Sequence, residues 1–326
     1  MQNGFRVLLA LALAAATWQA GAQAYPVKPV HIVVNFPPGG SSDAIARILS
    51  PGLSDRLGQP VLVDNRPGGG SGRGNIGATF VTHSAPDGYT LLISGVTIFY
   101  TLSTAPDAPP PYDPGKDFTP ITLLVTSPMV IAVNPARLPV NSITELVPLL
   151  KGKPGFAFGS GGKGSGMHLA GEQFKQLSGV DITHVPYKGN GPALNDLVGG
   201  QIPIAFIDLG SVTRFLKSGR VRVLAVASAQ RSALAPDIPT AAESGLPGWE
   251  ALGSFGLYGP GGLPAAIVRR VNTEVTALLV RPDIHERILA TGNEPAPTSA
   301  EEFGRYIARS VPRWVKMARD SGQTFD

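Results

Sequence analysis

Cysteine is absent from this 326-residue chain, and its absence excludes both thiol chemistry and disulfide bonds. Charged side chains are also scarce, at 15 % of residues, against about 25 % in a typical soluble domain. The 27 basic and 23 acidic residues leave a formal net charge of only +4, which is too small for a nucleic-acid-binding surface. We therefore expect a protein that is stabilised by burial of apolar side chains and has no nucleic-acid partner.

Motifs of common enzymes and cofactor sites are missing as well. The five histidines show no metal-ligand spacing, so no metal is expected. The chain has no Gly-x-Ser-x-Gly elbow, and no Gly-Lys pair is followed by Ser or Thr, as a Walker loop requires. Residues 72–77 and 159–164 match the dinucleotide fingerprint by letter but lack its strand-to-helix context and its acidic partner. These observations predict no cofactor and no enzyme activity.

Residues 1–24 have the pattern of an export signal. Arg6 precedes the apolar run 7–16, and a small-residue site, Ala22-Gln23-Ala24, precedes Tyr25. The alternative is an N-terminal membrane anchor, but about ten apolar residues fall well short of the roughly 20 that span a bilayer. We therefore predict cleavage before Tyr25 and a periplasmic location.

Glycine and proline are abundant, at 40 and 31 residues, and they separate short apolar segments along the whole chain. Strand-like segments alternate with helical patterns, which is typical of a parallel, doubly wound α/β sheet. Helices are expected to begin near residues 41, 75, 142, 165, 192 and 211, and only helices are expected after residue 260. The expected strands cover residues 30–36, 59–65, 90–94, 121–125, 129–133, 156–160, 182–187, 202–208, 221–227 and 252–260.

Two lobes are expected, because roughly 300 residues exceed the usual size of one core. The extended segments near residues 121–133 and 252–260 predict two hinge crossings, and the last helices are expected to return to the first sheet. The predicted fold is therefore two doubly wound sheets in a two-lobed monomer with a ligand cleft between the lobes. Lobe 1 is predicted to comprise residues 25–125 and 253–326, and lobe 2 residues 126–252.

The segment from Phe36 to Asp43 is predicted to be a tight turn between the first strand and the first helix. The first four N–H groups of a helix have no partner within it, and the helix dipole adds about half a positive charge there. A carboxylate can bind at such a position without an arginine, and Gly39 and Gly40 let it approach the backbone. The alternative is that Ser41 or Ser42 caps the helix with its own side chain.

A second turn of the same kind is predicted at residues 159–166, again between a strand and a helix. Ligands bind at the carboxyl edge of such sheets, so the two turns predict an anion held between the lobes. Lys163 is a candidate for a direct ionic contact.

Other candidate side chains follow strands at the same edge. Ser94 ends the third strand, and Tyr187 is expected at the cleft. His168 either contacts the ligand or packs within its helix. Asp208 either accepts a hydrogen bond from a ligand amine or hydroxyl, or caps the helix that begins near Ser211.

Short motifs along the chain together resemble the Bug-type receptors of tripartite tricarboxylate transporters, over nearly all of the chain after residue 24. The motifs are Tyr25-Pro26-x-Lys28-Pro29, Phe36-Pro37-Pro38-Gly39-Gly40 with Asp43, Asn65-Arg66-Pro67-Gly68, Asp87-Gly88-Tyr89-Thr90-Leu91-Leu92, Tyr112-Asp113-Pro114, Gly159-Ser160 through Glu172, His184-Val185-Pro186-Tyr187-Lys188-Gly189, and Leu224-Ala225-Val226 through Thr240.

This resemblance implies an extracytoplasmic solute-binding protein with the two α/β lobes of the periplasmic type II fold. It also implies that main-chain groups and bridging waters hold a small carboxylate, which is delivered to membrane transporter subunits. The ligand-binding residues that it implies are Phe36, Gly39, Gly40, Ser41, Ser42, Asp43, Ser160, Gly161, Ser165 and Gly166.

The chain departs from the family pattern at three places. The glycine loop 68–74 is longer, Lys163 replaces a neutral residue, and Gly52 interrupts the first helix. The resemblance does not identify the solute, because family members bind mono-, di- and tricarboxylates, amino acids and aromatic acids. Two alternative functions remain. One is a ligand-sensing subunit of a membrane sensor kinase, and the other is an exported hydrolase that uses Ser160 or Ser165 with His168.

Overall fold

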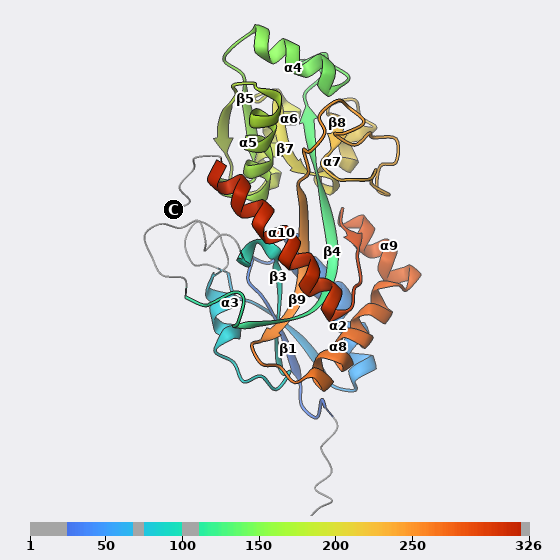
Figure 1. Ribbon diagram of the computed structural model, residues 1–326. Helices are drawn as coiled ribbons and strands as arrows, with labels where there is room; N and C mark the ends of the chain where they lie inside the picture. The colour runs from blue at the N-terminus through green and yellow to red at the C-terminus, as the bar shows by residue number, and fades with distance from the viewer. Residues whose placement is uncertain (1–24, 68–74, 100–110, 321–326) are drawn as a thin grey trace, which may run out of the picture.

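The computed structural model describes residues 25–67, 75–99 and 111–320 (Figure 1). The predicted export signal, residues 1–24, and the glycine loop 68–74 lie outside these ranges. Within the described ranges, no helix combines the length and the hydropathy that a membrane crossing requires.

The first lobe is built on three parallel strands joined by two helices, as the sequence predicts. β1 (Val30–Val34) lies between β2 (Val61–Asn65) and β3 (Thr90–Gly95). The helices α2 (Ser41–Leu57) and α3 (Asn75–Thr82) form the connections. Because the strands are parallel, their carboxyl ends meet at one edge of the sheet, where α2 begins.

Two long antiparallel strands connect the lobes. β4 (Phe118–Val133) pairs with β9 (Leu252–Pro260) along most of its length. The predicted strands 121–125 and 129–133 are therefore one continuous strand. The chain stays extended between them because Ser127 is itself paired with β9.

The second lobe repeats the alternation of strands and helices, and each element lies close to its predicted range. The strands are β5 (Ala157–Ser160), β6 (Thr183–Pro186), β7 (Ile204–Asp208) and β8 (Arg222–Val226), and the helices are α4 (Ile143–Gly152), α5 (Gly166–Ser178), α6 (Asn190–Gly199) and α7 (Leu209–Leu216).

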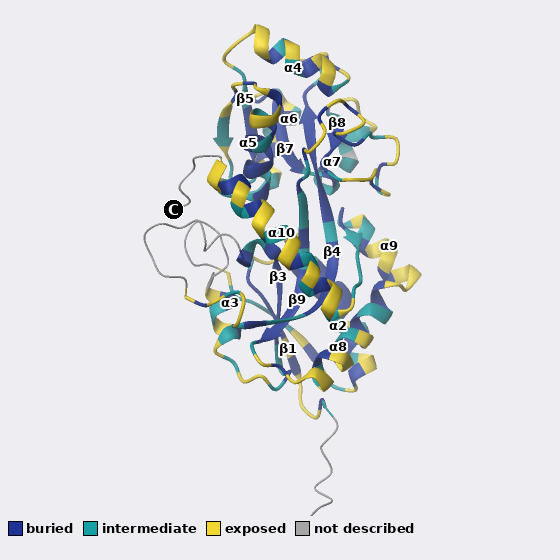
Figure 2. Cartoon of the chain, viewed as in Figure 1, coloured by how far each residue is buried: buried dark blue, intermediate teal, exposed yellow. Residues whose placement is uncertain are grey.

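The strand order is β2-β1-β3-β9-β4-β7-β5-β6, with β8 paired to β4 as well. The two halves of the sheet are thus joined through β4, and their strands form the buried interior of both lobes (Figure 2). The lobe boundaries at residues 125/126 and 252/253 stay a prediction.

The end of the chain returns to the first lobe and then crosses to the second. The elements are α8 (Ala265–Leu279), α9 (Pro282–Ala290), β10 (Glu294–Pro295) and α10 (Ala300–Asp320). The prediction of helices alone after residue 260 is wrong, because the two-residue β10 pairs with Thr126 and Val125 of β4.

Helix α10 contributes to the cores of both lobes, and Figure 1 shows it running alongside the two connecting strands. Phe303 and Ile307 pack in a cluster with Tyr258 of β9. Trp314 and Met317, two to three turns later, pack in the cluster of the second lobe. The expectation that the closing helices return to the first sheet therefore holds for α8 and α9, and α10 packs against the second lobe as well as the first.

Gly52 does not interrupt the first helix. Helix α2 is continuous from Ser41 to Leu57, with Pro51 inside it. A Cβ atom at Gly52 would lie 2.7 Å from a methyl carbon of Leu278. Glycine at this position therefore allows α8 to pack closely against α2.

Candidate functional site

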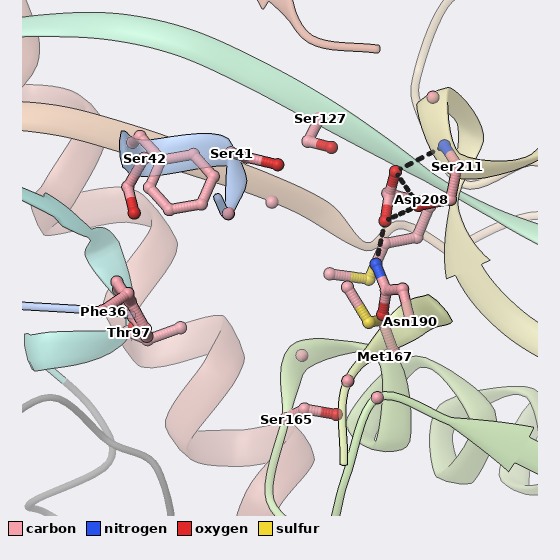
Figure 3. A pocket seen from close by; sticks show the side chains of 18 of the residues that line it. Phe36, Ser41, Ser42, Thr97, Ser127, Ser165, Met167, Asn190, Asp208 and Ser211 are labelled. Atoms are coloured by element: carbon pink, nitrogen blue, oxygen red, sulfur yellow. Dashed lines mark hydrogen bonds between the residues drawn. The ribbon is translucent and has the colours of Figure 1, made fainter. Parts of the chain in front are cut away.

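A cavity of about 710 Å³ lies between the two lobes (Figure 3). The turn from residue 36 to residue 42 lines it from the first lobe. From the second lobe it is lined by Gly161, residues 165–167, residues 188–191, Asp208, Gly210 and Ser211. Both predicted turns therefore open on one cavity, and residues of β4, β9 and α10 complete its wall.

The N-terminus of α2 opens on this cavity without a side-chain cap. The N-cap residue is Gly40, in an extended conformation with φ −82° and ψ 173°, and no side chain caps the helix. The alternative that Ser41 or Ser42 caps the helix is therefore wrong. Phe36, Gly39, Gly40, Ser41 and Ser42 all line the cavity, as predicted.

Asp43 stabilises the first turn from a position outside the cavity lining. Its Oδ2 accepts a hydrogen bond from the Gly39 N–H at 2.9 Å, and its Oδ1 accepts one from Nε of Arg47 at 2.9 Å. Burial raises its pKa, but the bonds from Arg47 and Gly39 outweigh this effect, so the pKa of Asp43 lies below its ordinary value. Asp43 is buried and does not line the cavity, so it positions the turn from outside the lining.

In the second turn, Gly161, Ser165 and Gly166 line the cavity. Ser165 caps α5, because its Oγ accepts a hydrogen bond from the His168 N–H at 3.2 Å. The same hydroxyl donates to the Gly162 carbonyl at 2.7 Å. Its proton is thus already held by a carbonyl oxygen, which is not the arrangement of a serine nucleophile with a histidine base.

Behind this turn, two histidine rings stack on each other. The rings of His168 and His184 have centroids 3.9 Å apart and an angle of 19°. Nδ1 of His168 accepts a hydrogen bond from the Gly164 N–H at 3.0 Å, and Ser160 Oγ lies 2.7 Å from Nε2 of His184. None of the three side chains lines the cavity. They support the loop that does.

Both histidines are held neutral in the folded protein. Burial lowers the pKa of His168 to about 3, with help from the neighbouring His184 and nearby lysines, and burial lowers the pKa of His184 to about 4. The carboxylate of Glu172 lies 3.7 Å from Nε2 of His168, but burial outweighs its attraction. The unfolded chain binds these protons near pH 6.5, so acid favours unfolding.

We therefore expect the folded state to lose stability as the pH falls from 6.5 towards 4. The slope is at most about 1.4 kcal/mol per pH unit for each excluded proton. The melting temperature of His168→Gln, measured across this range, should fall less steeply than that of the wild type. The matched control is His285→Gln, since His285 is exposed on α9. Equal slopes in all three proteins would contradict the expectation.

Three more predicted residues lie outside the cavity lining. Lys163 is exposed on its loop, and Ser94 is buried at the end of β3. The hydroxyl of Tyr187 donates to Oδ2 of Asp196 at 2.7 Å. Direct ligand contact by these three residues, and by Asp43, Ser160 and His168, stays a prediction, and the geometry gives it no support.

Asp208 caps a helix, which is one of the two roles considered for it, and a hydrogen bond from a ligand to this residue stays a prediction. Its side chain caps α7 by accepting from the Ser211 N–H at 2.8 Å, and it also accepts from Nδ2 of Asn190. It lines the cavity as well. Burial raises the pKa of Asp208, although the bonds from Ser211 and Asn190 act against this effect.

Several lining residues were missed in the sequence. Asn190 and Ser211 lie close to predicted residues, and their positions at helix starts could have pointed to them. Thr97, Ser127 and Trp314 carry no local signal, because they come from a short 3-10 turn, a hinge strand and the last helix. These three reach the cavity only through tertiary packing.

The two α/β lobes and the cavity between them, with helix N-termini opening on it, define a solute-binding protein of the periplasmic type. Residues 45–322 match the family model described as the tripartite tricarboxylate transporter family receptor. The chain belongs to this family of receptors.

Relatives with this fold include proteins seen with carboxylates. Protein BugT of Bordetella pertussis is 36 % identical over 304 residues, which cover 92 % of this chain and 91 % of BugT. A solved R. palustris protein with adipate is 35 % identical, with a TM-score of 0.80 over 91 % of this chain and 98 % of that one. MatC from Rhodopseudomonas palustris, with bound malate, is 30 % identical, with a TM-score of 0.76 over 90 % and 100 % of the two chains.

Proposed function

We propose that this protein is a periplasmic receptor that captures a small organic anion through its carboxylate. It would deliver this solute to the membrane subunits of a tripartite tricarboxylate transporter. The observation that carries the proposal is the N-terminus of α2, which opens on the cavity between the lobes without a side-chain cap.

A second helix presents its N-terminus to the same cavity. The N-cap of α6 is Gly189, again without a side-chain cap, and both Gly189 and Asn190 line the cavity. Unpaired N–H groups and the helix dipole at such positions favour an anion. A charge-assisted hydrogen bond contributes about 1.5 to 3 kcal/mol. Several of these bonds supply the roughly 8 kcal/mol of a micromolar complex.

The relatives support the same class of ligand. The family description names a tricarboxylate transporter receptor, and two similar structures were solved with adipate and with malate. The export-signal pattern of residues 1–24 agrees with a receptor that meets its solute outside the cytoplasm.

A thermal-shift screen of carboxylates tests the proposal. A ligand that binds only the folded state stabilises it by about 2.7 kcal/mol at 100 times its dissociation constant, so a binding carboxylate should raise the melting temperature. The protein should first be unfolded and refolded to remove solute from the expression host. The matched control for each hit is its neutral amide, which should produce no shift.

The outcome that would contradict the proposal is the absence of a shift with every carboxylate, amino acid and aromatic acid tested. Equal shifts from acids and their amides would contradict the role of the carboxylate. Uptake of the identified solute, compared between the parent strain and a strain that lacks this receptor, then tests the transport step.

A further inference from the structure

The cavity has an uneven distribution of charge. Among the described residues that line it, Asp208 is the only acidic residue and Lys188 the only basic one. Lys188 is exposed, whereas Asp208 is partly buried. Figure 3 shows Asp208 on the opposite side of the cavity from Phe36, Ser41 and Ser42. A helix N-terminus that attracts anions thus faces a carboxylate that repels them.

The carboxylate of Asp208 still has capacity to accept a hydrogen bond. A carboxylate offers about four lone-pair sites. The backbone N–H of Ser211 donates to one of them, and the amide of Asn190 donates to another. The Ser211 hydroxyl lies 2.9 Å from both carboxylate oxygens but has a single proton to donate, so three donor protons meet about four acceptor sites. These partners are neutral, and no ion pair within the described ranges neutralises Asp208. A donor on the ligand would complete this set of bonds.

The cavity wall between the N-terminus of α2 and Asp208 is largely apolar. Phe36 and Phe255 form an edge-to-face pair with centroids 6.5 Å apart, and both line the cavity together with Met129, Met167 and Trp314. Apolar side chains of this kind favour a hydrocarbon body over further charged groups.

We propose that the solute carries its carboxylate at the N-terminus of α2 and a hydrogen-bond donor, an ammonium or a hydroxyl, against Asp208. This inference rests on the proposed function and narrows its ligand class. It predicts discrimination against a dicarboxylate of the same length, because the second carboxylate would face Asp208. Burial raises the pKa of Asp208, and a ligand ammonium would offset this unfavourable desolvation.

Lys188 supports the opposite ligand preference, for a solute with a second carboxylate. Its ammonium lines the same cavity and would attract a second carboxylate. Because Lys188 is exposed, solvent screens its charge more strongly than that of Asp208. The two explanations predict opposite ligand preferences.

Matched straight-chain probes distinguish selection by Asp208 from selection by Lys188. For chains of four, five and six carbons, calorimetry on refolded wild-type protein compares the dicarboxylate, the ω-amino acid, the ω-hydroxy acid and the simple monocarboxylate. At the length that fits, the amino or hydroxy acid should bind at least about tenfold more tightly than the dicarboxylate, which corresponds to about 1.4 kcal/mol.

The variant Asp208→Asn then removes the charge and keeps the cap of α7, because asparagine is as good an N-cap as aspartate. It should lower the preference for the amino acid over the dicarboxylate by at least about tenfold. The matched control is Asp196→Asn. It removes a neighbouring carboxylate that bonds Tyr187 outside the cavity lining, and it should leave the preference unchanged.

A dicarboxylate that binds as tightly as the amino and hydroxy acids, and loses binding in Lys188→Ala, would overturn the inference but leave the proposed function intact. Equal effects of Asp208→Asn and Asp196→Asn would overturn it as well. If no probe of any length binds the wild type, and the broader carboxylate screen is also negative, the proposed function itself fails. If Asp208→Asn does not fold, the ranking of probes on the wild type decides.

Discussion

Replacing Ser41 with proline should weaken carboxylate binding by about tenfold or more while the protein stays folded. Proline is well tolerated at the first position of a helix, and Gly40 before it has the extended conformation that precedes proline. The substitution therefore removes one N–H group at the cavity and leaves α2 intact. The loss of one charge-assisted bond corresponds to about 1.5 to 3 kcal/mol, which calorimetry with a hit from the thermal-shift screen measures.

The matched control is Ser41→Ala, which removes the hydroxyl and keeps the backbone N–H. It should bind nearly as well as the wild type if the main chain holds the anion. The opposite result, with full binding by Ser41→Pro and loss of binding in Lys163→Ala, would show that a lysine rather than the helix N-terminus recognises the carboxylate.

Replacing Gly210 with alanine should hold the two lobes apart and weaken binding by more than about tenfold. Gly210 lies on α7 and meets Gly292, which follows α9. A Cβ atom at Gly210 would lie 2.1 Å from the Gly292 Cα atom. Overpacking of this kind costs about 1 to 3 kcal/mol or more, and here it acts where the lobes touch beside the cavity. Solute-binding proteins close around their ligand by such hinge motion.

Calorimetry measures the loss of affinity, and small-angle scattering measures whether ligand still compacts the protein. Alanine is a better helix former than glycine by about 1 kcal/mol, so α7 itself should not be destabilised. The matched control is Gly304→Ala on α10, where a Cβ atom has open space around it. If both variants bind and compact like the wild type, the contact between Gly210 and Gly292 does not limit closure.

The two turns could be predicted because their signals are local. In the first, two prolines and two glycines end an apolar strand and precede a helix start, and backbone rules for these residues suffice to place Gly40 before α2. The same reasoning found the turn before α5. Asp208 was expected either to cap the helix that begins near Ser211 or to contact the ligand, and the structure shows the cap.

Local rules could not show which polar side chains turn away from the cavity. Ser160, His168 and Tyr187 stand near the right sheet edge, yet each meets a partner outside the lining. A strand end specifies where a residue lies along the sheet. The direction of its side chain depends on neighbours such as His184 and Asp196, which become neighbours only when β6 and α6 pack beside β5.

The order and the type of nearly all helices and strands follow from the sequence, because hydrophobic periodicity and the positions of glycine and proline act over a few residues. The continuity of β4, the crossing of α10 and the approach of Gly210 to Gly292 depend on tertiary structure. Each joins segments that are far apart in the chain, so each is set by how the two lobes pack rather than by local propensity. The cavity depends on local sequence rules and on tertiary packing together. Local rules place its two anion-attracting turns, and packing brings Trp314 and Asp208 into the same cavity.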